Sequence, residues 1–159
     1  MKESRLQRYM DFISFNLESE GYRMTAQAEQ YVERVLEDDL SGDEAVSEIV
    51  DSFGLASESD TSVSPDGCYE GTDVCINYYG IRDQELLDEI ETYIVAVRMA
   101  QIMIGPQEWN YNFDHLKSIH GTLFGDIYPF AGEIRYIPIT RRTMFCLPNY
   151  IQRVADEIF

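Results

Sequence analysis

Residues 113–145 constrain the fold more than any other segment, because a helical pattern gives way there to a β-prone one within a few residues. The first part carries an apolar stripe made of Leu116, Ile119 and Leu123. Spacings of three and four residues place such side chains on one face of an α-helix. An aromatic connection at 128–130 and the tripeptide Ala-Gly-Glu then lead into a basic segment rich in β-forming residues. The segment therefore predicts a helix, a sharp break and a small hairpin that carries arginines.

The composition predicts a protein with a packed core. The 159 residues allow one ordinary domain or a small domain with an appendage, and 45% of them are hydrophobic. The longest apolar runs are only a few residues long and no signal-peptide pattern opens the chain, so we expect a cytoplasmic protein without a membrane partner. The spacing of Cys68, Cys75 and Cys146 fits no zinc pattern, so we expect reduced thiols and no metal site.

The net charge of −17 argues against nucleic acid as a partner, because an acidic surface repels a phosphate backbone. The distribution of charge is more informative than its sum. Residues 18–60 are rich in Asp and Glu, whereas residues 135–142 contain three arginines and no acidic residue. This contrast can steer an anionic nucleotide, or the acidic N-terminal part itself, toward the predicted hairpin.

The N-terminal third predicts three short amphipathic helices. The first spans about residues 4–19 and stops before Gly21, because glycine readily adopts the left-handed conformation that follows a last turn. Thr25 can cap a second helix, and Ser41 with Glu44 has the capping-box spacing that opens a third. Apolar and aromatic residues recur on one face of each predicted helix: Leu6, Tyr9, Met10, Ile13 and Leu17; Tyr31, Val32, Val35 and Leu36; Val46, Ile49, Val50 and Phe53.

A polar segment divides the chain. Residues 55–67 are Ser-, Asp- and Glu-rich, contain a Pro and a Gly, and lack any apolar period. We therefore predict a small helical domain at 1–54, a linker at 55–67 and a second domain at 68–159. Three short helices alone bury little surface, so the first domain is expected to pack on something larger.

The second part predicts further helices. Asp83 can cap a long helix over residues 84–104, which Gly-Pro terminates, and Asn112 can cap a helix over 113–124. Pro148 suits the first position of a final helix.

Two segments of the second part are candidates for strands. Residues 73–80 read equally well as a strand or as an extended apolar pad. Residues 135–140 and 143–147 predict two short strands, and Pro138 makes the first an edge strand because proline cannot donate to a ladder. The predicted fold class is therefore mainly α, with a small β-hairpin and a preceding three-helix appendage.

Residues 116–135 contain the run L-x-x-I-H-x-x-L-F-x-D-I-Y-P-x-A-G-E-x-R, and residues 68–81 contain C-Y-E-G-T-D, I-N and G-I at matching places. Together these motifs resemble the front part of a Fic domain, over roughly residues 66–159. The Fic family transfers AMP from ATP onto hydroxyl groups of target proteins. The resemblance implies a helical fold in which the hairpin, called the flap, aligns an extended segment of the target and closes over the nucleotide.

On this resemblance the flap spans Arg135 to Phe145. The residues expected to contact nucleotide or target are Arg135, Thr140, Arg141, Arg142 and Phe145. Arg141 matches the basic residue that is common in the family, whereas Arg142 stands where a glycine is usual. The residues themselves leave open a solvated basic turn without a ligand.

Neither histidine is expected to act as a base. His120 lies on a helix beside apolar neighbours and does not match the family's catalytic histidine, so we expect a structural role for it. His115 is expected to be exposed.

The family's catalytic motif, H-P-F-x-x-G-N-G-R-x-x-x-R, is not found within the 159 residues. ATP with Mg²⁺ is implied for the complete enzyme, and we expect no AMP transfer by this chain alone. A fragment explains this best, and a naturally truncated or split protein, or a regulatory part that works with another chain, are the alternatives.

The segment Asn16-Leu17-Glu18-Ser19-Glu20-Gly21 resembles the inhibitory motif of Fic regulation, [ST]-x-x-x-E-[GN]. The surrounding residues, about 10–53, look like a VbhA-type antitoxin domain. The resemblance implies that Glu20, followed by Gly21, pairs with an arginine of the catalytic loop and occupies the place of the ATP γ-phosphate. Asn16 stands where Ser or Thr is usual, and the alternative is a plain solvated helix end.

Two functions follow from these observations. The first is an autoinhibited Fic-type protein adenylyltransferase represented by its inhibitory and front-half residues. The second is a non-catalytic module that docks a peptide or a partner Fic chain through the flap and the antitoxin-like helices. An inactive remnant is a third reading. Expected partners are a target protein presented as an extended segment, and the C-terminal half of a Fic domain or another Fic chain.

Overall fold

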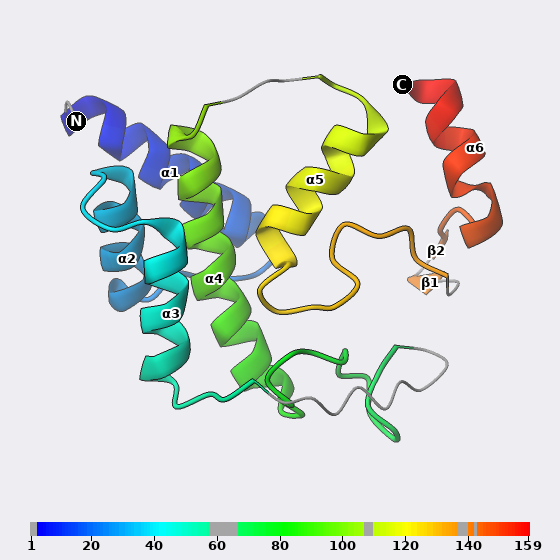
Figure 1. Cartoon of the computed structure of the whole chain (residues 1–159), viewed down its shortest axis with the longest axis horizontal. Helices are drawn as coiled ribbons and strands as arrows, with labels where there is room; N and C mark the ends of the chain where they lie inside the picture. The colour runs from blue at the N-terminus through cyan, green and yellow to red at the C-terminus, as the bar shows by residue number, and fades with distance from the viewer. Residues whose placement is uncertain (1–2, 58–66, 107–109, 137–139, 142) are drawn as a thin grey trace. The chain divides into compact units, whose positions relative to one another are not determined.

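The computed structural model describes residues 3–57, 67–106, 110–136, 140–141 and 143–159, which are mainly α-helical (Figure 1). The elements in chain order are α1 (Glu3–Ser19), α2 (Ala26–Leu36), α3 (Gly42–Ser52), α4 (Gln84–Ile104), α5 (Phe113–Phe124), β1 (Thr140–Arg141), β2 (Thr143–Met144) and α6 (Pro148–Ile158). They form two compact units. Unit 1 comprises Met1–Ser57 with Asp83–Gln107, and unit 2 comprises Glu58–Arg82 with Glu108–Phe159.

Unit 1 is a helical bundle centred on α4, against which α1, α2 and α3 all pack (Figure 1). The sequence of α4 is apolar on most of its circumference, which is typical of a helix enclosed by others. The side chains of Ile90 and Ile94 are completely buried, as are those of Ile13, Val32 and Ile49 from the surrounding helices. The core of unit 1 is thus built from aliphatic side chains contributed by all four helices.

The helix starts in unit 1 are those predicted from the sequence. The Thr25 hydroxyl accepts a hydrogen bond from the Ala28 N–H and caps α2. Ser41 and Glu44 form the predicted capping box at α3, and the Asp83 carboxylate accepts from the Leu86 N–H at the start of α4. These caps satisfy backbone donors that have no partner inside the helix.

The first three helices end in the same way, with a residue at positive φ. Gly21 (φ 92°), Asp38 (φ 66°) and Gly54 (φ 64°) occupy these positions. After α1 the Tyr22 N–H donates to the Leu17 carbonyl at 2.9 Å, which is the bond that defines a Schellman motif. The predicted stop at Gly21 is confirmed, because only glycine adopts this conformation without strain.

Unit 2 contains α5, the β1–β2 hairpin, α6 and the irregular segment from Gly67 to Arg82. As predicted, Asn112 caps α5, and its side-chain oxygen accepts from the His115 N–H at 2.8 Å. Residues 73–80, predicted to be a strand or an extended apolar segment, form neither a full strand nor a helix. One antiparallel bridge pairs Cys68 with Cys75. The Tyr78 N–H donates to the Ile127 carbonyl at 2.9 Å, which ties this segment to the turn after α5.

The hairpin is shorter than the sequence suggested. β1 and β2 pair antiparallel in a register that sets Thr140 opposite Met144 and Arg141 opposite Thr143. Arg135 and Tyr136 lie in neither strand. The edge position predicted for Pro138 lies outside the described residues.

The compact units do not follow the boundary at 55–67. The helix α4 was assigned to the second domain by sequence, yet it supplies the core on which α1–α3 pack. The predicted domains at 1–54 and 68–159 stay predictions, whereas packing groups α4 with the N-terminal helices. Within the described residues, none of the helices is long and apolar enough to cross a membrane.

Candidate functional site

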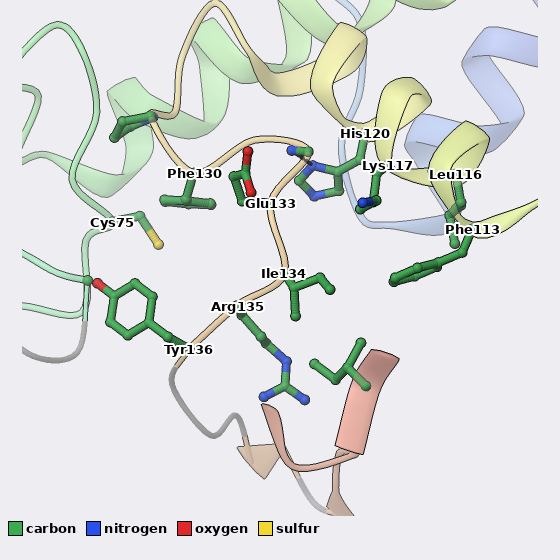
Figure 2. Close-up of a pocket in the computed structure, with 14 residues that line it drawn as sticks. Cys75, Phe113, Leu116, Lys117, His120, Phe130, Glu133, Ile134, Arg135 and Tyr136 are labelled. Atoms are coloured by element: carbon green, nitrogen blue, oxygen red, sulfur yellow. Dashed lines mark hydrogen bonds between the residues drawn. The ribbon is translucent and has the colours of Figure 1, made fainter. Parts of the chain in front are cut away.

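A cavity of about 740 Å³ lies in unit 2, beside the segment that leads into the hairpin (Figure 2). Cavities that hold small ligands range over about 300–1,000 Å³ and are mostly apolar with a few polar groups. This cavity fits that description. Its principal lining residues are Cys75, Phe113, Leu116, Lys117, His120, Phe130, Gly132, Glu133, Ile134, Arg135, Tyr136 and Ile151.

One hydrogen bond holds α5 to the opposite wall of the cavity. The Gly132 N–H donates to Nδ1 of His120 at 3.0 Å (Figure 2). Gly132 has a φ of 81°, and a Cβ at this position lies 3.1 Å from the Lys117 carbonyl oxygen and 3.3 Å from the Gly121 Cα. The Ala-Gly-Glu turn therefore needs glycine for two reasons, its backbone conformation and its close approach to α5.

The geometry gives His120 a structural role, in agreement with the prediction. Because Nδ1 accepts a hydrogen bond, the proton of the neutral ring is on Nε2. Partial burial of the ring lowers the pKa of His120, which favours this neutral form. The ring also contacts that of Phe124, with centroids 4.9 Å apart. The prediction that His115 is exposed is wrong, since its side chain is half-buried.

Charged side chains lie along the cavity. Lys117 forms an ion pair with Asp114 at 2.9 Å and lies over the ring of Phe113. The hydrogen bond that Lys117 donates to the Asp114 carboxylate raises the pKa of Lys117, and the charge of Glu133 acts in the same direction. The Arg135 guanidinium donates to the carbonyl oxygen of Cys146. Arg135 thus joins the segment before β1 to the segment after β2 and closes the base of the hairpin.

The other predicted flap residues are only partly placed. Thr140 and Arg141 lie in β1, and Arg142 lies outside the described residues. Phe145 follows β2 and is half exposed. The structure therefore brings Arg135 to the cavity and leaves the side-chain contacts of the hairpin tip as predictions.

The predicted inhibitory residues lie at the end of α1, in unit 1. The Asn16 side chain donates to the Phe12 carbonyl at 2.7 Å, so it bonds back to its own helix. Glu20 is exposed, and its N–H donates to the Leu17 carbonyl at 3.1 Å. Gly21 provides the left-handed residue of the Schellman motif. The backbone of the motif is fixed while the Glu20 carboxylate faces solvent.

A second, smaller cavity of about 360 Å³ adjoins this motif within unit 1. Its walls are the segment Gly21–Arg23 with Thr25, and α4 residues Glu85, Asp88, Glu89, Thr92 and Tyr93. Sequence reasoning missed it. The acidic residues of α4 were visible at helical spacing, but nothing local indicated that the α1–α2 connection faces them. Among the described residues, no three His, Cys, Asp or Glu side chains are arranged to hold a metal ion.

The chain is thus mainly helical, with an apolar cavity beside a short hairpin, and comparison with the sequences of known proteins adds to this description. No family model matches the chain. It is 34% identical over 93 residues to the probable protein adenylyltransferase y4lH of Sinorhizobium fredii, which covers 58% of this chain and 47% of that protein. It is 35% identical over 91 residues to the probable protein adenylyltransferase Fic of Escherichia coli, covering 57% of this chain and 44% of that protein.

A third relative is the protein adenylyltransferase VbhT of Bartonella schoenbuchensis, at 34% identity over 88 residues, covering 55% of this chain and 18% of that protein. These matches show that the chain is similar to protein adenylyltransferases, two of which are named Fic, and they support the resemblance to the Fic family. The chain spans about half the length of the first relative, at 47%. None of these names mentions an antitoxin-like domain, so the antitoxin-like domain at the N-terminus stays a prediction.

Proposed function

We propose that the chain is the inhibitory and front part of a cytoplasmic Fic-type adenylyltransferase, which transfers AMP from ATP to a hydroxyl side chain of a target protein. The observation that carries this proposal is the 34–35% identity to proteins named adenylyltransferases over more than half of the chain. The apolar cavity next to the hairpin supports it, because transfer requires a nucleotide and a protein segment to meet at one site.

In this proposal the hairpin aligns the target. β1 and β2 form a sheet of two strands, so each has an outer edge that can accept an extended segment through backbone hydrogen bonds. Arg141, in β1, and its sequence neighbour Arg142 are proposed to supply positive charge for the triphosphate. Mg²⁺ enters bound to the nucleotide, and the described residues contain no ligand cluster of their own for it.

Glu20 is the proposed inhibitory residue. Its carboxylate is exposed at the end of α1, and the Schellman bond from Tyr22 to Leu17 holds the backbone on either side of it. A fixed, exposed carboxylate can pair with an arginine that otherwise binds the γ-phosphate of ATP. Asn16 occupies the position where Ser or Thr is usual. Its side chain donates to a carbonyl of its own helix, so the role proposed for Glu20 is unchanged.

The test is an AMP-transfer assay with radiolabelled ATP and Mg²⁺ on the complete protein that contains these residues. Glu20→Gly is expected to raise self-modification by about tenfold, since regulatory couplings are worth roughly 5- to 150-fold. Glu18→Gly, at an exposed position two residues earlier, is the matched control and leaves the rate unchanged. Equal rates for the two variants contradict inhibition by Glu20, and no transfer by any variant contradicts the enzyme.

The second candidate is a non-catalytic module that docks a peptide or a partner Fic chain. It is favoured by the outer edges of β1 and β2, which can accept an extended segment without any chemical step. The encoding DNA, or the intact mass of the native protein, separates the two functions. A continuation that contains both motifs supports the enzyme, whereas a stop codon after Phe159 supports the docking module. For residues 1–159 alone, we expect no AMP transfer.

A further inference from the structure

Two cysteines face each other across the only isolated β-bridge among the described residues of unit 2. Cys68 pairs with Cys75 in antiparallel orientation. The Tyr69 N–H donates to the Val74 carbonyl at 3.0 Å, and the Ile76 N–H donates to the Gly67 carbonyl at 3.1 Å. These bonds flank the cysteine pair on both sides. Cys68 and Cys75 are therefore a non-hydrogen-bonded pair, the kind in which opposed side chains approach each other most closely.

The two sulfur atoms lie on the same face of the bridge, as side chains of directly opposed residues do. The other face is the buried one, because the alternate residues Tyr69, Val74 and Ile76 are each less than a tenth exposed. Both cysteines are half-buried reduced thiols. In a non-hydrogen-bonded pair the Cα atoms are about 4.5 Å apart. A disulfide accepts separations of about 4.4–6.8 Å, so the backbone already has the spacing that a bond needs.

The turn between the cysteines holds this register. Gly71 has a φ of 75°, the Thr72 hydroxyl donates to the Tyr69 carbonyl at 2.9 Å, and the Val74 N–H donates to the Thr72 hydroxyl at 3.2 Å. Beyond the bridge, the Asn77 side chain binds the backbone of Ile81 through two hydrogen bonds. The backbone and side-chain hydrogen bonds around the bridge thus hold the two cysteines opposite each other.

We propose that Cys68 and Cys75 form a reversible disulfide in response to small-molecule disulfides such as oxidised glutathione. The thiolate of one cysteine attacks a sulfur of the oxidant and releases one reduced thiol. The thiolate of the other cysteine then attacks the mixed disulfide and releases the second. The oxidant gains two electrons and two protons, which the protein thiols lose. This inference does not depend on the proposed enzymatic function.

The bond is placed to act on the larger cavity. Cys75 lines the cavity (Figure 2), as does Gly67, which precedes Cys68 in the sequence. The Tyr78 N–H, three residues after Cys75, donates to the Ile127 carbonyl in the turn after α5. Oxidation joins the two sides of the bridge covalently and fixes the wall, whereas reduction leaves the bridge held by its hydrogen bonds alone.

The experiment uses the full chain carrying Cys146→Ser, which removes the exposed third cysteine and leaves the pair intact. The folded protein is equilibrated with mixtures of reduced and oxidised glutathione and quenched by alkylation. Oxidation is expected to remove two alkylatable thiols and to lower the mass of the protein before alkylation by about 2 Da. Peptide mapping is expected to find residues 68 and 75 joined by a disulfide, with the protein still monomeric. Dithiothreitol is expected to restore both thiols.

The control is Cys68→Ser with Cys146→Ser, which leaves Cys75 alone and is expected to gain one glutathione without internal cross-linking. Both variants are checked by circular dichroism, so that a folding defect is recognised. The proposal is overturned if both thiols stay alkylatable at every glutathione ratio. It is also overturned if the disulfide forms only in urea, or if only mixed or intermolecular disulfides are found.

Discussion

The two compact units use their helices differently. In unit 1, α4 is buried along most of its length and the helices around it each contribute fully buried aliphatic side chains. In unit 2, α5 contains no buried residue, and α6 contains only one, Ala155. Unit 1 thus has an ordinary core, whereas unit 2 surrounds a cavity.

The difference shows where interaction is expected. Unit 2 exposes large apolar side chains near its cavity and hairpin, among them Leu116, Tyr136 and Phe145, each at least half exposed. Exposed apolar side chains that gather around a cavity mark a binding surface more often than a plain one. The bundle of unit 1 carries Glu20, whereas the exposed apolar side chains of unit 2 lie around its cavity and hairpin.

The largest expected effect tests the packing of unit 1. Ile94→Ala is expected to lower the free energy of unfolding by about 3 kcal/mol, because it removes a fully buried side chain and leaves a cavity. Leu116→Ala in α5 is the matched change in unit 2, and its cost is expected to stay below about 1 kcal/mol because Leu116 is half exposed. Urea unfolding followed by residue-resolved NMR measures both. Equal costs contradict the contrast between the units.

An intermediate effect tests the turn that lines the cavity. Gly132→Ala is expected to cost about 2 kcal/mol, from its positive φ and from contact with the Lys117 carbonyl. Gly71→Ala is the control, because Gly71 has a similar φ of 75° but no atom within 4 Å of the added Cβ. Its cost is expected to be about 1 kcal/mol, from the backbone conformation alone. If Gly132→Ala costs no more stability than Gly71→Ala, the close approach of Gly132 to α5 does not contribute to the need for glycine.

The smallest effect concerns pH. The pKa of His120 is lowered by partial burial, so the unfolded chain binds a proton more readily than the folded one. Stability contributed by the neutral ring is present above the ordinary value of 6.5 and is lost as pH falls below it. Unit 2 is expected to become less stable between pH 7.5 and 5.5, as followed by amide exchange of Gly132.

His120→Asn provides the control, because the Asn oxygen replaces Nδ1 as an acceptor for the Gly132 N–H and does not titrate. This variant is expected to keep the turn and to lose the pH dependence around Gly132. An unchanged pH profile contradicts the assignment of the effect to His120.

Local features of the fold could be predicted from the sequence. The caps at Thr25, Ser41, Asp83 and Asn112 are all confirmed, because each depends on one side chain and the backbone three residues away. The stop at Gly21 is confirmed for the same reason. The family resemblance, carried by a long motif around His120, is also confirmed by the relatives.

Features that depend on distant residues could not be predicted. The bond between His120 and Gly132 spans twelve residues, and the opposition of Cys68 and Cys75 depends on a turn whose register the sequence does not show. Packing of α4 with α1–α3 crosses the segment that composition marked as a boundary. Only the hairpin register and the base contact of Arg135 are described for the flap, so its ligand contacts stay predictions.

The discontinuity of unit 1 has a consequence for synthesis of the chain. Helices α1–α3 leave the ribosome first, but the helix that covers their apolar faces is complete only at Ile104, about fifty residues after α3 ends at Ser52. At elongation rates of about 5–20 residues per second, those faces wait several seconds for their partner. During that interval the nascent chain presents a hydrophobic surface to chaperones, and the segment between α3 and α4 sets how long the exposure lasts.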